Sequence, residues 1–165
     1  MKEFVCNYAA VRFLPYPETG EFVNVGVVVY CPEIGYFDFR MKGGRNGRIH
    51  QFFPELNGKI WQAAIEAFRA HLTKFQHGSE FRAHGVPQTA EQAQRGVAAF
   101  QHLVRRRESL LHFAEPSVIL AAEPERALDE LFHQLVEHKL AQRKNSGKTQ
   151  TERLHELAEV KRRTA

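Results

Sequence analysis

The feature that most constrains the fold is a valine-rich segment, Phe22–Tyr30, that lies between two short clusters of turn-forming residues. Pro15–Gly20 precedes this segment and Pro32–Gly35 follows it, and both clusters contain the proline and glycine that tight turns favour. Asn7–Leu14 and Tyr36–Lys42, on either side, also read as strands. Because short connections join consecutive antiparallel strands, the sequence predicts a three-stranded meander.

Helical periodicity follows the predicted meander in three places. Apolar residues recur three and four apart in Trp61–Phe75, and again in Thr89–Val104, which opens with a Thr-x-x-Gln capping box. A third helix is predicted over Pro124–Val136, because proline suits the first turn of a helix. Two short apolar segments split by Pro116 supply at least one further strand. The expected fold class is α+β, an antiparallel sheet of three to four strands packed by about three helices.

The net charge of +4 lies entirely near the end of the chain. Residues 141–165 contain seven Lys or Arg and three Glu, which leaves equal numbers of each sign in residues 1–140. We therefore expect a single α+β domain over residues 1–140 and a basic, helical C-terminal extension over residues 141–165. A basic extension can attract nucleic acid or an acidic protein.

The composition places the chain among folded globular proteins, with 43% hydrophobic and 25% charged residues. Two cysteines cannot form a disulfide framework, which favours a reducing compartment. No stretch approaches the roughly 20 apolar residues that span a bilayer, and no secretion signal precedes the first strand. The expectation is a cytoplasmic protein that does not contact a membrane, with its oligomeric state left open.

The alternation of side chains along the strands predicts a polar face on the sheet. A register that pairs Arg12 with Asn24 and places Gly26 opposite both Ala10 and Arg40 separates the side chains into two sets. One set is apolar and needs helices to cover it; it includes Phe13, Val11, Ala9, Val23, Val25, Val27, Val29, Phe37, Phe39 and Met41. The other face carries Arg12, Asn24 and Arg40 around a depression at Gly26, which could hold an anionic ligand or an acidic partner segment.

The same residues carry a resemblance to a known family. Tyr8-Ala9-Ala10-Val11-Arg12-Phe13-Leu14-Pro15, followed by Gly20-Glu21-Phe22-Val23-Asn24-Val25-Gly26, resembles the opening of the bacterial family named domain of unknown function 3037. The resemblance covers most of residues 4–138, and its motif positions are Arg12, Glu21, Asn24 and Gly26. It implies no established activity. Family members are often encoded beside HipA-like kinases, which implies an accessory role in a toxin–antitoxin or defence system.

No catalytic or metal-binding pattern accompanies this motif. The nine histidines lack zinc-ligand spacing, and neither a nucleophile elbow nor a phosphate-binding loop occurs, so no metal and no cofactor are expected. Glu21 stands alone after a turn, where a glutamate usually caps or pairs with a cation.

The leading hypothesis is a non-catalytic binding or accessory module that acts on a protein partner through Arg12, Glu21, Asn24, Gly26 and Arg40. One alternative is a nucleic-acid-binding protein that uses its basic loop and tail, with Lys42, Arg45, Arg48, Arg143 and Lys144 as contacts. A further alternative is an uncharacterised enzyme, a nuclease or phosphoryl-processing activity, with Arg12, Glu21 and Asn24 in its site.

Overall fold

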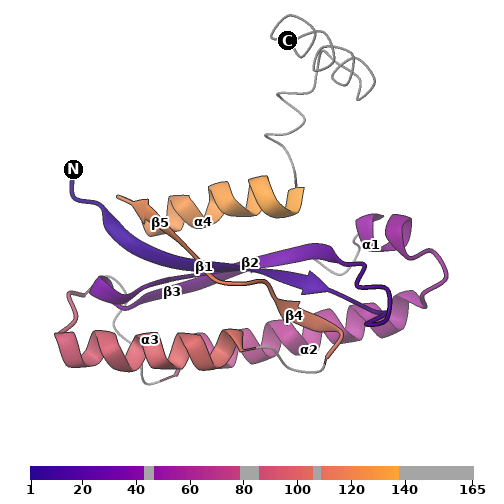
Figure 1. Ribbon diagram of the computed structural model, residues 1–165, viewed down its shortest axis with the longest axis horizontal. Helices are drawn as coiled ribbons and strands as arrows, with labels where there is room; N and C mark the ends of the chain where they lie inside the picture. The colour runs from indigo at the N-terminus through magenta and orange to yellow at the C-terminus, as the bar shows by residue number, and fades with distance from the viewer. Residues whose placement is uncertain (43–46, 79–85, 106–108, 138–165) are drawn as a thin grey trace, which may run out of the picture.

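The computed structural model describes residues 1–42, 47–78, 86–105 and 109–137. Strands and helices follow one another in blocks: three strands, three helices, two strands and a last helix (Figure 1). This segregation confirms the predicted α+β fold.

The sheet has five strands, and each is antiparallel to its neighbours. The predicted meander consists of β1 (Phe4–Phe13), β2 (Val23–Cys31) and β3 (Tyr36–Met41), with β2 in the middle. The other side of β1 is shared by two short strands. β4 (Leu111–Phe113) pairs with its C-terminal part, and β5 (Ser117–Ala121) pairs with its N-terminal part. Both apolar segments around the intervening proline are therefore strands.

The helices of the described residues are α1 (Gly47–Phe52), α2 (Gly58–Gln76), α3 (Ala90–Val104) and α4 (Pro124–Phe132), with a 3-10 turn η1 (Pro32–Ile34) and a π-helical turn η3 (His133–Glu137) that continues α4. Local signals fix the starts of α3 and α4. The Thr89 hydroxyl accepts from the Gln92 N–H, and the Gln92 side chain accepts from the Thr89 N–H, which confirms the capping box of α3. Pro124 lies in the first turn of α4, as predicted.

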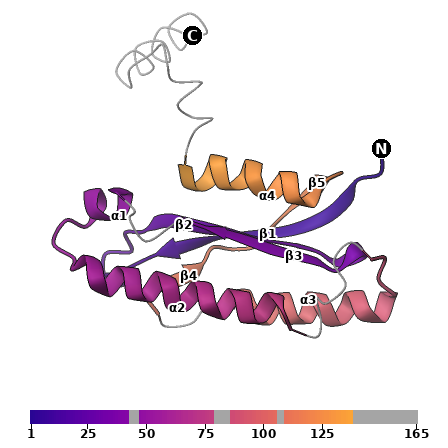
Figure 2. The ribbon, with the colours of Figure 1, turned by 180° about the vertical axis from the view of Figure 1, so that it is seen from behind.

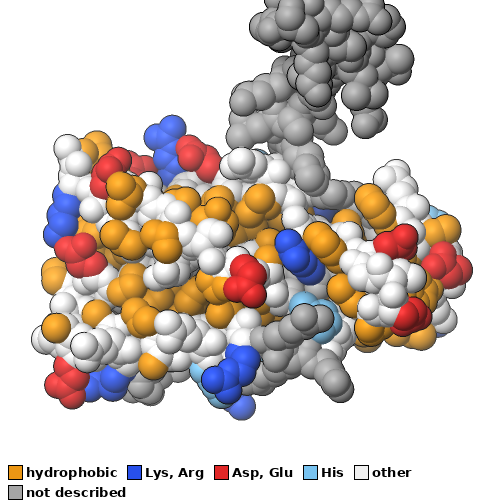
Figure 3. All heavy atoms as spheres, in the orientation of Figure 1, with side chains coloured by type: hydrophobic (Ala, Val, Ile, Leu, Met, Phe, Trp, Pro, Cys, Tyr) orange, Lys and Arg blue, Asp and Glu red, His pale blue; other side chains and the backbone are white. Residues whose placement is uncertain are grey.

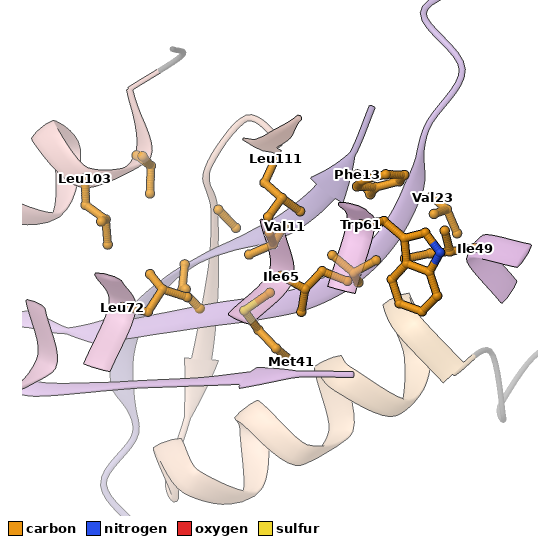
Figure 4. Close-up of a cluster of buried hydrophobic side chains, with 14 of the residues drawn as sticks. Val11, Phe13, Val23, Met41, Ile49, Trp61, Ile65, Leu72, Leu103 and Leu111 are labelled. Carbon is orange, nitrogen blue, oxygen red and sulfur yellow. The ribbon is translucent and has the colours of Figure 1, made fainter. Parts of the chain in front are cut away.

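The helices cover both faces of the sheet. Figures 1 and 2 view the sheet nearly along its plane, with α4 above it and α2 and α3 below. Between the sheet and α2, Trp61, Ile65 and Leu72 pack against Val11 and other strand residues (Figure 4). A second cluster joins the opposite face to α4 through Leu128. Fully burying a side chain of this size contributes about 1.5–3 kcal/mol, so each layer holds the sheet.

The predicted strand register is wrong by one residue over most of the sheet. Arg12 pairs with Asn24 as predicted, but Val11 pairs with Gly26, so Val25 is an extra residue in β2, a β-bulge. The second hairpin is shifted as well, because η1 and the left-handed glycine after it (φ 60°) bring the last residue of β2 opposite the first residue of β3.

The shift moves part of the valine run to the other face. Val27 and Val29, which were expected beside Val23 and Val25, instead belong to the cluster beneath α4. Two fully buried valines on that face require an apolar cover, because their exposure would cost stability. The expectation of a single helix-covered face is therefore corrected: α4 covers the second face.

Candidate functional site

Arg12, Asn24 and Arg40 lie on one face of the sheet, as predicted, but that face is the one that α4 packs against. Arg12 and Asn24 are cross-strand partners, and Arg40 pairs with Val27, whose side chain belongs to the cluster under α4. α4 and η3 occupy part of the surface that the sequence analysis assigned to a ligand. The three residues consequently have three different environments.

Asn24 joins the sheet to the end of the last helix. Its side-chain Nδ2 donates to the backbone carbonyl of Leu135 in η3 at 3.1 Å. Its Oδ1 is buried and has no hydrogen-bond partner. The donor half of this amide therefore serves the fold, because it satisfies a carbonyl that has left the regular α-helical ladder.

Arg40 also contacts the last helix. Its Nε lies 2.5 Å from Asp129 Oδ1 of α4, and the two side chains are 46% and 42% exposed. An ion pair at this exposure contributes about 0–1 kcal/mol. Arg40 is therefore a helix-docking residue of small energetic weight, and its guanidinium is already engaged by a carboxylate.

Gly26 belongs to the opposite face and forms no depression. A Cβ at Gly26 would lie 2.8 Å from the Arg40 carbonyl oxygen and 2.9 Å from Met41 Cγ. The glycine is thus required by the close approach of β3, which is one of the two explanations that a glycine inside a strand suggests. The predicted hollow between Arg12 and Arg40 is corrected, since Val27 occupies the position expected for Gly26.

Glu21 is exposed in the turn before β2, where its backbone N–H donates to the Thr19 hydroxyl at 3.3 Å. It does not line the groove described below. Arg12 and Asn24 are cross-strand partners, and the enzyme hypothesis, which also requires Glu21, stays a prediction.

Arg12 opens into a groove at the β4 edge of the sheet, which we name the Arg12 groove. Its volume is about 590 Å³, and it lies where β1, β4, the end of α3 and the β1–β2 turn meet. Its lining comprises Arg12, Leu14, Gly20, Phe22, Gln101, Val104, Arg105, His112, Phe113, Ala114, Glu115 and Pro116. Two arginines and a histidine face one glutamate there, so the groove attracts anions.

The guanidinium of Arg12 is stacked on an aromatic ring and keeps a buried donor without a partner. Its Cζ lies 4.0 Å from the centroid of the Phe22 ring, a cation–π contact. Its Nε is buried without a hydrogen-bond partner, and the described residues offer Arg12 no ion pair. Leaving a partly buried charge uncompensated lowers stability. Such a group suits a carboxylate or phosphate, which can accept two parallel hydrogen bonds from the guanidinium fork.

Sequence reasoning missed the neighbours of Arg12. Phe22 was used only as the start of the second predicted strand, and the histidines were considered only as metal ligands. The signal for His112 is its position in β4 directly opposite Arg12, which depends on a pairing between segments a hundred residues apart. Arg105 joins the groove because α3 ends there.

The residues of the nucleic-acid hypothesis are mostly outside the described residues. Arg45, Arg143 and Lys144 lie outside them, and of Arg48 only the backbone in α1 is described. Lys42 follows β3, where its N–H donates to the Val25 carbonyl at 2.8 Å. The hypothesis stays a prediction.

Within the described ranges, no three side chains of His, Cys, Asp or Glu gather closely enough to hold a metal ion. None of the helices in those ranges combines the length and apolar character of a membrane span. Cys6 and Cys31 are buried neighbours on β1 and β2, and the hydrogen bond between them lowers the pKa of Cys6 and raises the pKa of Cys31, which burial raises further.

Comparison with known proteins identifies a family but no activity. Residues 8–136 match the family described as "Protein of unknown function (DUF3037)", a range that includes β2, β3, α4 and the C-terminal part of β1. No curated protein and no solved structure matches the chain.

Proposed function

The chain belongs to the DUF3037 family of proteins of unknown function, and we propose that it is a non-catalytic binding module that recognises an acidic group of a protein partner in the Arg12 groove. The single observation that carries this proposal is the state of Arg12. Its guanidinium is half-buried, stacked on an aromatic ring, and has a buried Nε without a partner. In the free protein this arrangement costs stability, and an acidic ligand would recover it.

The surroundings of Arg12 favour an anion and orient it. Stacking on Phe22 holds the plane of the guanidinium, so less side-chain freedom is lost when a carboxylate binds. Arg105 lines the same groove and adds positive potential, and His112 adds an imidazole that can hydrogen-bond. Because the Arg12 side chain is half-buried, an ion pair formed with its guanidinium is screened less by salt than one at the surface.

The apolar part of the lining favours a protein partner. Leu14, Phe22 and Val104 stand beside the charged groups, and Phe22 is 40% exposed. An apolar side chain of a partner next to an acidic one would bury this surface, as the centres of protein interfaces do. An acidic residue flanked by an apolar residue is therefore the chemistry that the proposal assigns to the partner. The family's association with HipA-like kinases in toxin–antitoxin systems supplies one candidate partner for the test.

The proposal predicts that Arg12→Gln weakens the capture of a partner. The wild-type chain, Arg12→Gln and a control, Arg126→Gln, are used as baits in extracts of the native host, and captured proteins are then purified for titration calorimetry. Arg126 is an equally cationic residue of α4 that pairs with Glu130 away from the groove. We expect Arg12→Gln to weaken the isolated complex roughly 30-fold or more, because truncating one member of a desolvated charge pair costs at least about 2 kcal/mol.

Arg12→Lys keeps the charge but loses the two-pronged donor geometry, so its affinity should lie between those of the wild type and Arg12→Gln. Equal affinity of all four proteins for every captured partner would contradict the proposal. Loss of binding in Arg126→Gln as well as Arg12→Gln would show a dependence on overall charge instead of the groove.

A further inference from the structure

The two outer edges of the sheet differ in whether other parts of the chain cover their backbone groups. On the β3 edge, side chains of α2 reach the strand's carbonyl groups. Gln76 Nε2 donates to the Phe37 carbonyl at 3.2 Å, and Arg69 donates to the carbonyls of Met41 and Lys42 at 3.5 and 3.3 Å. Figure 2 shows α2 running along this side of the sheet. The β3 edge is therefore closed to another strand.

The β5 edge has no such cover among the described residues. β5 pairs with β1 alone, and no hydrogen bond from those residues reaches its outer side. The Ala10 carbonyl accepts from the Ala114 N–H on the β4 and β5 side of β1, so even-numbered residues of β1 direct their backbone groups that way. Their partners are Ser117, Ile119 and Ala121. Val118 and Leu120 consequently present their N–H and C=O groups outward.

The exposed side chains of this strand are apolar. Val118 is 62% exposed and Leu120 is 63% exposed, and Val5, the cross-strand partner of Leu120, is 51% exposed. Ser117–Ala121 contains neither a charged residue nor a proline. These are the residues that normally protect a strand edge from pairing. In Figure 3 hydrophobic side chains gather over the part of this face where Figure 1 places β5.

We propose that β5 is a dimerisation strand, which pairs antiparallel with β5 of a second copy of this chain. With the two-fold axis at Ile119, Val118 of each copy lies opposite Leu120 of the other, and the outward backbone groups form four hydrogen bonds. The exposed Val118 and Leu120 side chains of both copies then meet on one face of a continuous sheet. This surface is separate from the Arg12 groove, whose lining includes none of these residues.

A second copy is the occupant that the two edges favour. An open apolar edge is an aggregation site, and a two-fold pairing covers both open edges at once. Head-to-tail growth would need the β3 edge, which Gln76 and Arg69 close. The assembly therefore ends at two copies instead of extending into a fibre.

The test is sedimentation velocity of the full chain over a wide concentration range, with three proteins. The wild type should sediment as twice its 19.0 kDa. Leu120→Lys should be monomeric, because two lysines would face the apolar partner strand, and its exposed position leaves folding intact. Ile60→Lys, a change of a 61% exposed isoleucine on α2, should remain a dimer.

Hydrogen exchange identifies the surface directly. The amide protons of Val118 and Leu120 should exchange slowly in the wild type. In Leu120→Lys the amide proton of Val118 should exchange at least tenfold faster than it does in the wild type. A monomeric wild type would overturn the proposal. This includes a monomer in which the Val118 amide is protected from exchange only after another protein is added, because β5 would then bind that protein and not a second copy. A dimer that survives Leu120→Lys, or one with unprotected Val118 and Leu120 amides, would also overturn it.

Discussion

At the scale of single residues, the positions of the motif separate into those that serve the fold and one, Arg12, that lines a groove. The Asn24 amide donates to the last helix, and Gly26 makes room for a neighbouring strand. Arg12 alone retains a buried donor without a partner and stands in a groove. A sequence motif can therefore mix both roles within a few residues, and only the side-chain environment distinguishes them.

Gly26→Ala should destabilise the protein by about 1–3 kcal/mol, because the new methyl group would overlap the β3 backbone, which cannot move as a side chain can. Urea unfolding followed by circular dichroism measures the change. Gly58→Ala is the matched control, since its methyl group would meet only Trp61 Nε1 at 3.7 Å. The control should change stability by less than about 1 kcal/mol, and stabilisation is its expected direction in the first turn of α2. An unperturbed Gly26→Ala would refute the close-approach explanation.

At the scale of elements, the β-bulge in β2 determines where the last helix must go. Because Val25 is an extra residue, Val27 and Val29 turn to the second face and need cover. α4 supplies that cover through Leu128 and Leu131. Asn24, which lies just before the bulge, then accommodates the π-helical end of this segment.

Asn24→Ala should loosen η3 more than it destabilises the whole protein. The substitution removes a hydrogen bond worth about 1 kcal/mol, but it also removes the unpaired Oδ1. Amide exchange in α4 and η3 should become several-fold faster while exchange in β1 and β2 stays unchanged. Arg126→Ala, which removes an exposed pair with Glu130, is the control and should change neither. Unaltered exchange in η3 would mean that Leu135 does not depend on Asn24.

At the scale of the whole molecule, the fold class and the starts of α3 and α4 could be predicted because they depend on neighbouring residues. The meander could be predicted from the turn-forming residues between the strands, and the capping box of α3 consists of two residues three positions apart. The Arg12 groove could not be predicted in the same way. It requires β4 to pair with β1 across about a hundred residues, and it requires α3 to end beside that pair. A one-residue bulge likewise cannot be recognised in a run of valines, yet it moves the side chains that follow it to the opposite face of the sheet.

The central claim is that Arg12 receives an acidic group, and the NMR signal of its Nε–H tests this most directly. A glutamate-rich peptide and its glutamine counterpart are each titrated into the 15N-labelled chain, with the Nε–H signal of Arg126 as an internal reference. We predict that the glutamate peptide shifts the Arg12 signal saturably downfield, since a new charge-assisted hydrogen bond forms there, and that the glutamine peptide does not. An Arg12 signal that stays in place, or that moves no further than the Arg126 signal, would contradict the account.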